Sequence, residues 1–213
     1  MTTPPNHRPG HIDVPLNVWP GPATTAEITT QVAARLAAPG ESVTVIDADI
    51  DPSDLVATGR RVTAIATSRR DAGAVLAELP ALPVADRSRL TMLYSPRAAL
   101  ADTLARFAGR SRLTIAPARL TALPDIWAGA VATLQPAGRL ALIDAAGPAD
   151  LPPVATNDLV FQAHIVCAAT EVYEHAAAEA EELDEEFALP EALTRVHRDV
   201  ALFCRTDFAG GER

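Results

Sequence analysis

The chain contains no lysine, and all 18 of its basic residues are arginine. A Schiff-base lysine, a phosphate-loop lysine and a pyridoxal-phosphate anchor are therefore excluded. Cysteine is scarce as well. Cys167 and Cys204 are too few for a disulfide scaffold and suit a reducing compartment, so we expect a cytoplasmic protein.

Long apolar runs are also missing. No run reaches the roughly 20 residues that cross a bilayer, and the first residues, MTTPPNHRPGH, lack the apolar core of a secretory signal. The 213 residues have a globular composition, with 48 % hydrophobic and 21 % charged residues. A net charge of −9 repels nucleic-acid phosphates, so we do not expect autonomous nucleic-acid binding, and we expect no membrane association.

The most informative stretch is PGESVTVIDADIDPSDLVATGRRVTAIATS, residues 39–68. It predicts, in order, a strand (42–46), an acidic loop, a short helix within 51–59 and a second strand (61–67). Such a β-α-β unit normally holds a nucleotide-like cofactor at the end of its first strand. The candidate cofactor-binding residues are therefore the loop aspartates Asp47, Asp49 and Asp51.

Strands and helices continue to alternate along the chain, which predicts a mainly parallel sheet with crossover helices. We expect further strands over 90–94, 113–116 and 139–144, and helices over 69–79, 96–107 and 125–134. An earlier helix begins at Thr24 or Thr25, which can cap it. Two apolar segments, 160–168 and 196–205, predict a C-terminal antiparallel strand pair whose last strand enters the sheet.

The predicted elements divide the chain into three parts. These are an irregular N-terminal arm (1–22), an α/β domain (23–207) with an acidic insertion (171–191), and a C-terminal tail (208–213). Charge runs usually face water, so we interpret the insertion as a solvated helix or loop. The alternative is an acidic docking surface for a basic partner.

In this order the elements resemble the Class I S-adenosylmethionine-dependent methyltransferases, which have five alternating β/α units followed by an antiparallel hairpin. The resemblance rests on PGESVTVID and PDIWAGAVATLQPAGRLALID and covers most of residues 18–207. More narrowly, VWPGPATTAEITTQVAARLAAPGESVTVID, FQAHIVCA and VHRDVALFCR are similar to the start and the last two strands of amino-methylating DNA methylases. The resemblance implies an α/β, Rossmann-like methyltransferase fold.

The cofactor loop departs from the family pattern. In the family an acidic residue, here Asp47, is followed by a glycine-rich loop, but residues 48–53 contain no glycine. Glycine allows positive φ and a close approach of the backbone to the cofactor. A β-branched residue such as Ile50 is an outlier at positive φ, and Pro52 removes a backbone donor.

Two other motifs of the family are missing. An acidic residue normally binds the ribose hydroxyls at the end of the second strand, where this chain has Ala66-Thr67-Ser68. After the fourth strand the DNA methylases carry Ser/Asp/Asn-Pro-Pro-Tyr/Phe/Trp, which binds the target amine and stacks on the flipped base. Residues 116–120, APARL, offer neither a side-chain acceptor nor a ring.

We therefore predict a catalytically degenerate methyltransferase-fold protein, with no catalytic residue and no cofactor, that acts as a structural or partner-docking subunit. Its partner would be another protein or a second copy of itself. The alternative is an active, DNA methylase-like S-adenosylmethionine-dependent methyltransferase with an unusual cofactor loop, using Asp47 and Asp144.

A third hypothesis places a divalent cation at the loop aspartates, which include Asp54. Pro52 and Thr58 stand where a calcium loop needs glycine and glutamate, so we predict no metal site and expect Asp51 or Ser53 to cap the short helix instead. On the two C-terminal strands, His164 with His197 and Cys167 with Cys204 are candidate cross-strand neighbours.

Overall fold

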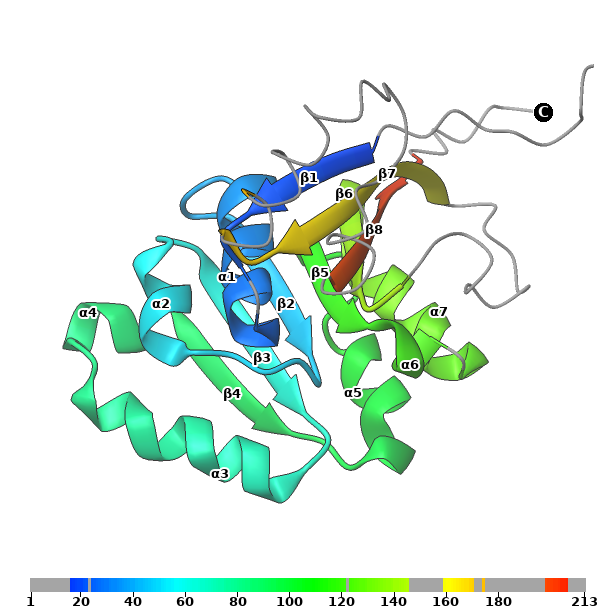
Figure 1. Ribbon diagram of the computed structural model, residues 1–213. Helices are drawn as coiled ribbons and strands as arrows, with labels where there is room; N and C mark the ends of the chain where they lie inside the picture. Colours follow the sequence, from blue (N-terminus) through cyan, green and yellow to red (C-terminus); the bar gives the residue numbers. More distant parts are fainter. Residues whose placement is uncertain are drawn as a thin grey trace, which may run out of the picture.

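A computed structural model describes residues 16–22, 24–121, 123–145, 159–170, 174 and 198–206. They form an open eight-stranded sheet in the order β1-β7-β8-β6-β5-β2-β3-β4 (Figure 1). The strands are β1 (Leu16–Pro20), β2 (Ser42–Ile46), β3 (Arg61–Ala66), β4 (Leu90–Tyr94), β5 (Ser111–Pro117), β6 (Leu134–Ile143), β7 (Leu159–Ala168) and β8 (Arg198–Arg205).

Helices cover both faces of this sheet. They are α1 (Thr25–Leu36), α2 (Pro52–Ala57), α3 (Arg69–Glu78), α4 (Val84–Arg87), α5 (Leu100–Ala105), α6 (Ala118–Thr121) and α7 (Pro124–Thr133), with 3-10 turns at Leu79–Ala81 and Arg97–Ala99. β8 runs antiparallel to β6 and β7, and the other pairs are parallel. The predicted fold class, a mostly parallel sheet with a C-terminal antiparallel strand pair, is confirmed.

Two apolar clusters form the core, one on each face. Helices α1, α2 and α3 pack on one face, and α5 and α7 on the other (Figure 1). Alternation along β2 serves both clusters, because Val43 and Val45 point to the first and Ile46 to the second. Each fully buried side chain of this kind contributes about 1.5–3 kcal/mol to folding.

Both ends of α1 are fixed by side chains. At its start, the Thr24 hydroxyl accepts from the Glu27 N–H, and the Glu27 carboxylate accepts from the Thr24 N–H, which makes the predicted cap a capping box. At its end, the buried Arg60 guanidinium donates to the carbonyls of Ala34 and Ala37. Arg60 immediately precedes β3, so it also ties α1 to the sheet.

The N-terminal segment differs from the prediction. Residues 16–20 form the edge strand β1, which pairs in parallel with β7, whereas the sequence predicted an irregular arm over 1–22. The prolines led to that prediction, but proline is tolerated on edge strands. Residues 1–15 of the arm, the tail 208–213 and, apart from Glu174, the acidic insertion 171–191 lie outside the described residues.

Strand β6 begins earlier than predicted, at Leu134 instead of 139. The residues between the predicted helix and strand, Gln135–Gly138, are an irregular part of the strand, where the register against β5 shifts and Ala137 has φ 55°. Gly138 is needed there because a Cβ would come within 2.8 Å of the Gln135 carbonyl oxygen.

Of the two predicted pairs on the C-terminal strands, the cysteine pair is not formed. Cys167 lies opposite Arg198, and Cys204 lies opposite Val160, so the cysteines are at opposite ends of the β7–β8 pair. His164 pairs with Asp199, and His197 lies outside the described residues. Within the described part of the chain, no helix is long and apolar enough to span a membrane.

Candidate functional site

The sheet has a topological switch point between β2 and β5, because the chain continues from β2 to β3 on one side and later returns to place β5 on the other. Ligands of open α/β sheets bind outside the carboxyl ends of the strands at such a point. Asp47 follows β2, Thr67 follows β3 and Arg119 lies in α6 after β5. These three residues border the switch point.

Asp47 is held by its neighbours. Its carboxylate, 14 % exposed, accepts hydrogen bonds from the N–H of Thr67 at 3.1 Å and from the Thr67 hydroxyl at 2.5 Å. The other carboxylate oxygen pairs with Arg119 Nη2 at 3.2 Å. The side chain therefore joins the ends of β2 and β3 and reaches across to the β5 side.

The left-handed residue of the cofactor loop is Asp47, with φ 47°. Because the loop has no glycine, the sequence predicted an unfavourable positive φ at a residue such as Ile50. Ile50 instead has an ordinary φ and packs on the first core cluster. Aspartate tolerates the left-handed conformation better than a β-branched residue. With Asp47 left-handed, the chain turns after β2 without a positive φ at residues 48–53.

Asp51 caps the helix α2. Its carboxylate accepts from the N–H groups of Ser53 at 2.8 Å and Asp54 at 3.2 Å, and Pro52 occupies the first helical position. This is the predicted structural role of Asp51. Both bonds use Oδ1, which turns this oxygen toward the first turn of its own helix.

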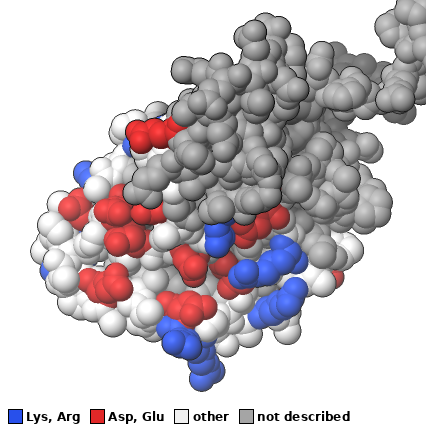
Figure 2. Space-filling view, viewed as in Figure 1, with Lys and Arg blue, Asp and Glu red and all other residues white. Residues whose placement is uncertain are grey.

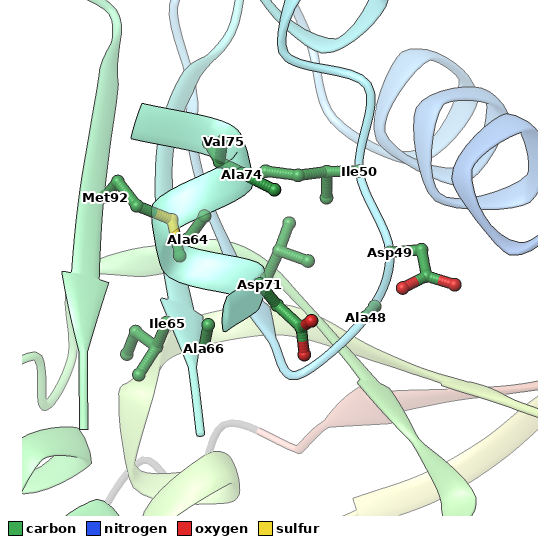
Figure 3. A pocket seen from close by; sticks show the side chains of 11 residues that line it. Ala48, Asp49, Ile50, Ala64, Ile65, Ala66, Asp71, Ala74, Val75 and Met92 are labelled. Atoms are coloured by element: carbon green, nitrogen blue, oxygen red, sulfur yellow. The ribbon is translucent and has the colours of Figure 1, made fainter. Parts of the chain in front are cut away.

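Asp49 is different from Asp47 and Asp51. It is exposed, and no hydrogen bond or ion pair from the described residues reaches its carboxylate. It borders a cavity of about 280 Å³ between the loop after β2 and α3 (Figure 3). The lining residues are Val45, Ala48, Asp49, Ile50, Ala64, Ile65, Ala66, Asp71, Ala74, Val75 and Met92.

The three residues at the end of β3 have structural roles. Ala66 lines the cavity, Thr67 binds Asp47, and the Ser68 hydroxyl accepts from the N–H groups of Arg70 and Asp71 to cap α3. The next acidic residue along the chain is Asp71, which was not among the residues predicted from the sequence. Its position in the first turn of the predicted helix was the available signal.

The segment 116–120 also forms part of the framework. Pro117 ends β5 and Leu120 is buried in the second cluster, while Arg119 is 69 % exposed and reaches Asp47. An exposed ion pair of this kind contributes only about 0–1 kcal/mol. The Arg119 guanidinium is therefore held at the switch point only by weak interactions with Asp47.

Two more charged pairs lie near the carboxyl edge of the sheet. Asp144, left-handed with φ 62°, pairs with Arg198 at 3.3 Å, and Arg198 also donates to the Thr25 hydroxyl. His164 Nε2 lies 2.6 Å from Asp199 Oδ1. The sequence offered no local signal for either pair, because the partners are 54 and 35 residues apart.

Burial changes one titration clearly. Cys167 is buried, and this burial, with a smaller contribution from Asp199, raises the pKa of the thiol from 9.0 to about 11, while Arg35 acts in the opposite direction. In the described ranges, no three His, Cys, Asp or Glu side chains form a group that could hold a metal ion.

Comparison with known proteins yields similarity of structure. No family model matches the chain, and no curated protein is similar to it in sequence. A TehB-like SAM-dependent methyltransferase from Corynebacterium glutamicum superposes with a TM-score of 0.52 and 13 % identity, over 83 % of this chain and 86 % of that one.

Two further structures are similar at lower scores. A SAM-dependent methyltransferase from Geobacter sulfurreducens, in complex with S-adenosyl-L-homocysteine, gives a TM-score of 0.49 and 14 % identity, over 86 % of this chain and 91 % of that one. The glycopeptide N-methyltransferase MtfA, complexed with S-adenosyl-L-methionine, gives 0.45 and 19 %, over 66 % of this chain. The chain spans 60 % of the length of MtfA.

The likeness to the TehB-like enzyme, together with the strand order, assigns the chain the fold of the Class I SAM-dependent methyltransferases. Five alternating strands and helices, β2 to β6, are followed by the antiparallel β7 and β8. The resemblance drawn from the sequence is thereby confirmed at the level of fold.

Proposed function

We propose that this protein is a methyltransferase-fold subunit that has lost S-adenosylmethionine chemistry and acts by docking another protein chain. The proposal has two halves. The first concerns the residues at the switch point, and the second concerns the free edge of the sheet.

The hydrogen bonds of Asp47 support the loss of S-adenosylmethionine chemistry. Both of its carboxylate oxygens already have partners, Thr67 on one and Arg119 on the other, and Thr67 holds the carboxylate toward the end of β3. The loop from Ala48 to Asp51 has no glycine to admit a ligand against its backbone, and Ile50 folds down onto the core. These residues do not fit an adenosyl cofactor at this place.

The cavity beside the loop supports the same conclusion. Sites for drug-sized ligands usually enclose about 300–1,000 Å³, and this cavity encloses about 280 Å³. Its lining side chains are apolar apart from Asp49 and Asp71, and it lies on the α3 side of the loop, away from the β5 side. It therefore offers little room and few polar partners for a nucleoside.

The β4 edge of the sheet supports the docking of another chain. At the two ends of β4, the Arg89 carbonyl accepts from the Val62 N–H of β3, and the Ser95 N–H donates to the Ala66 carbonyl of β3. Backbone groups alternate in direction along a strand, so those of Leu90, Met92 and Tyr94 point away from β3. Within the described chain no strand pairs with this edge. Such an edge is a template for adding a strand from another chain.

A second copy of this chain suits the edge. Helix α3 packs beside β4, Gly73 and Leu76 of this helix are exposed, and Arg69 stacks on the Tyr94 ring at 5.3 Å. A two-fold axis that pairs β4 with β4 of the second copy would bring the two α3 helices, with their exposed Leu76 side chains, to the same interface.

Sedimentation velocity tests this docking. We expect the wild-type chain to sediment as a concentration-dependent dimer, and Leu76→Arg to sediment as a monomer. Val160→Arg on β7 is a matched control, since Val160 and Leu76 are exposed to 53 % and 51 %. A monomeric wild-type protein at all concentrations, or equal effects of both variants, would refute self-docking through β4.

The competing function is an active methyltransferase, of DNA methylase-like or other specificity, with an unusual cofactor loop. The fold shared with the TehB-like SAM-dependent methyltransferase favours it. A methyl-transfer assay with radiolabelled S-adenosylmethionine and DNA, RNA or protein acceptors separates the two functions. We expect no transfer above background, whereas transfer that disappears in Asp47→Ala would establish the competing function.

A further inference from the structure

The cavity beside the loop has aliphatic walls. Figure 3 shows Ile50 extending from the loop toward Ala74 and Val75 of α3, with Ala64 and Met92 behind them. The cavity is nearly twice the size of a 150 Å³ apolar cavity that holds a benzene ring. It can therefore enclose an aliphatic body of roughly six to eight carbon atoms.

Two carboxylates stand at the rim of this cavity. Asp49 comes from the loop and Asp71 from the first turn of α3, and both lie at the same end of the cavity in Figure 3. Both residues are exposed, and within the described chain neither carboxylate has a hydrogen-bond or ion-pair partner. The nearby Arg69 stacks on the Tyr94 ring and so does not neutralise Asp71.

The wider surface has the same sign of charge. Figure 2 shows acidic side chains gathered over the α2–α3 side of the visible face. Carboxylates at the rim of a low-dielectric hollow focus the field and raise the local concentration of cations. A bare metal ion is not the fitting ligand, because the described residues provide no group of three ligating side chains.

We propose that this cavity binds a small organic cation, its ammonium group between Asp49 and Asp71 and its aliphatic body against Ile50, Val75 and Met92. Burial of the chain supplies the affinity, and the two carboxylates supply the preference for positive charge. The site is independent of S-adenosylmethionine chemistry and of docking through β4.

Met92 provides a direct reporter. The chain has two methionines, Met1 and Met92, so a protein labelled with ¹³C-methyl methionine gives one resonance from the cavity wall. The probes are hexylammonium, hexanol and hexanoate, which share the aliphatic chain and differ in charge. We expect hexylammonium to shift the Met92 signal with a Kd on the order of 1 mM, hexanol to bind more weakly, and hexanoate not to bind.

Variants at the rim sharpen the test. Asp49→Asn and Asp71→Asn should each weaken hexylammonium binding by about 3- to 10-fold, because each removes one of the two charges. Asp54→Asn is the matched control, since Asp54 is also an exposed aspartate of this region but does not line the cavity. It should change the affinity less than 2-fold.

Three outcomes would overturn the proposal. These are an unmoved Met92 signal at 20-fold excess over the expected Kd, equal binding of hexanoate, or equal weakening by Asp54→Asn. None of them bears on the proposed loss of methyl transfer, which is measured with S-adenosylmethionine itself. The two conclusions can therefore fail separately.

Discussion

The loop after β2 has two sides of opposite character, one toward the switch point and one toward the cavity beside α3. Toward the switch point, Asp47 is bound by Thr67 and Arg119, and Asp51 is bound by the first turn of α2. Toward α3, Asp49 and Asp71 stand at an apolar cavity without partners among the described residues. Four aspartates in one region thus divide into two that hold the fold and two that are available.

This difference shows that the partners of a carboxylate, and not its place in a motif, decide its role. A carboxylate that accepts backbone N–H groups is a structural element whose removal destabilises the fold. One that faces solvent over an apolar hollow contributes almost nothing to stability and can bind a ligand. Stability and binding measurements on the four aspartates can therefore test the division.

The largest effect is expected at Asp47. Asp47→Ala leaves the Thr67 donors without their acceptor, removes the ion pair with Arg119 and places alanine at φ 47°. We expect a loss of about 2–4 kcal/mol in the free energy of unfolding, measured in urea. Asp47→Gly, which removes the same bonds without left-handed strain, should lose about 1 kcal/mol less; a loss under 1 kcal/mol in Asp47→Ala would contradict the structural role.

Cys167 extends the comparison to a fully buried group. Between pH 9 and pH 11 the unfolded chain releases the thiol proton while the folded protein keeps it, because burial raises the pKa of Cys167 to about 11. Stability that is present below pH 9 should therefore fall, by up to about 2–3 kcal/mol, as the pH rises to 11. Cys167→Ala should lack this part of the decline, and parallel pH profiles of the two proteins would show that the thiol is not buried.

A smaller effect is expected at Asp51. Asp51→Ala removes the cap of a six-residue helix, and loss of such a cap costs about 1 kcal/mol. Asp51→Asn should keep most of that stability because asparagine also caps helices. Urea unfolding of both variants measures the difference, and equal losses would argue against capping.

The smallest effects are expected on the cavity side. Asp49→Asn and Asp71→Asn should change the free energy of unfolding by no more than about 0.5 kcal/mol, since exposed side chains without partners contribute little. Arg119→Ala, which breaks an exposed ion pair, should cost about 0–1 kcal/mol. If Asp49→Asn destabilised the protein as much as Asp47→Ala, the division into structural and available aspartates would be wrong.

Sequence patterns predicted the elements that depend on near neighbours. The strand at 42–46, the cap at Asp51 and the C-terminal strand pair all follow from local alternation, helix-start residues and turn residues. The partners of Asp47 could not be predicted from local patterns, because Thr67 and Arg119 lie 20 and 72 residues away. Such contacts are set by strand order and by the crossover helices, which bring distant strand ends to one edge.

The candidate site was predictable in part for the same reason. The sequence identified the loop and its three aspartates, but it could not separate Asp49 from Asp47 and Asp51. It also missed Asp71, because the contact between α3 and the loop is a matter of packing. The edge strand β1 was missed because its pairing with β7 joins segments nearly 150 residues apart.

Calorimetric titration of the wild-type protein with S-adenosylmethionine tests the central claim most directly. The engaged carboxylate of Asp47 and the glycine-free loop predict no binding at micromolar concentrations. A micromolar Kd, or a crystal structure with the adenosyl group against residues 47–53, would contradict the claim and restore an active methyltransferase.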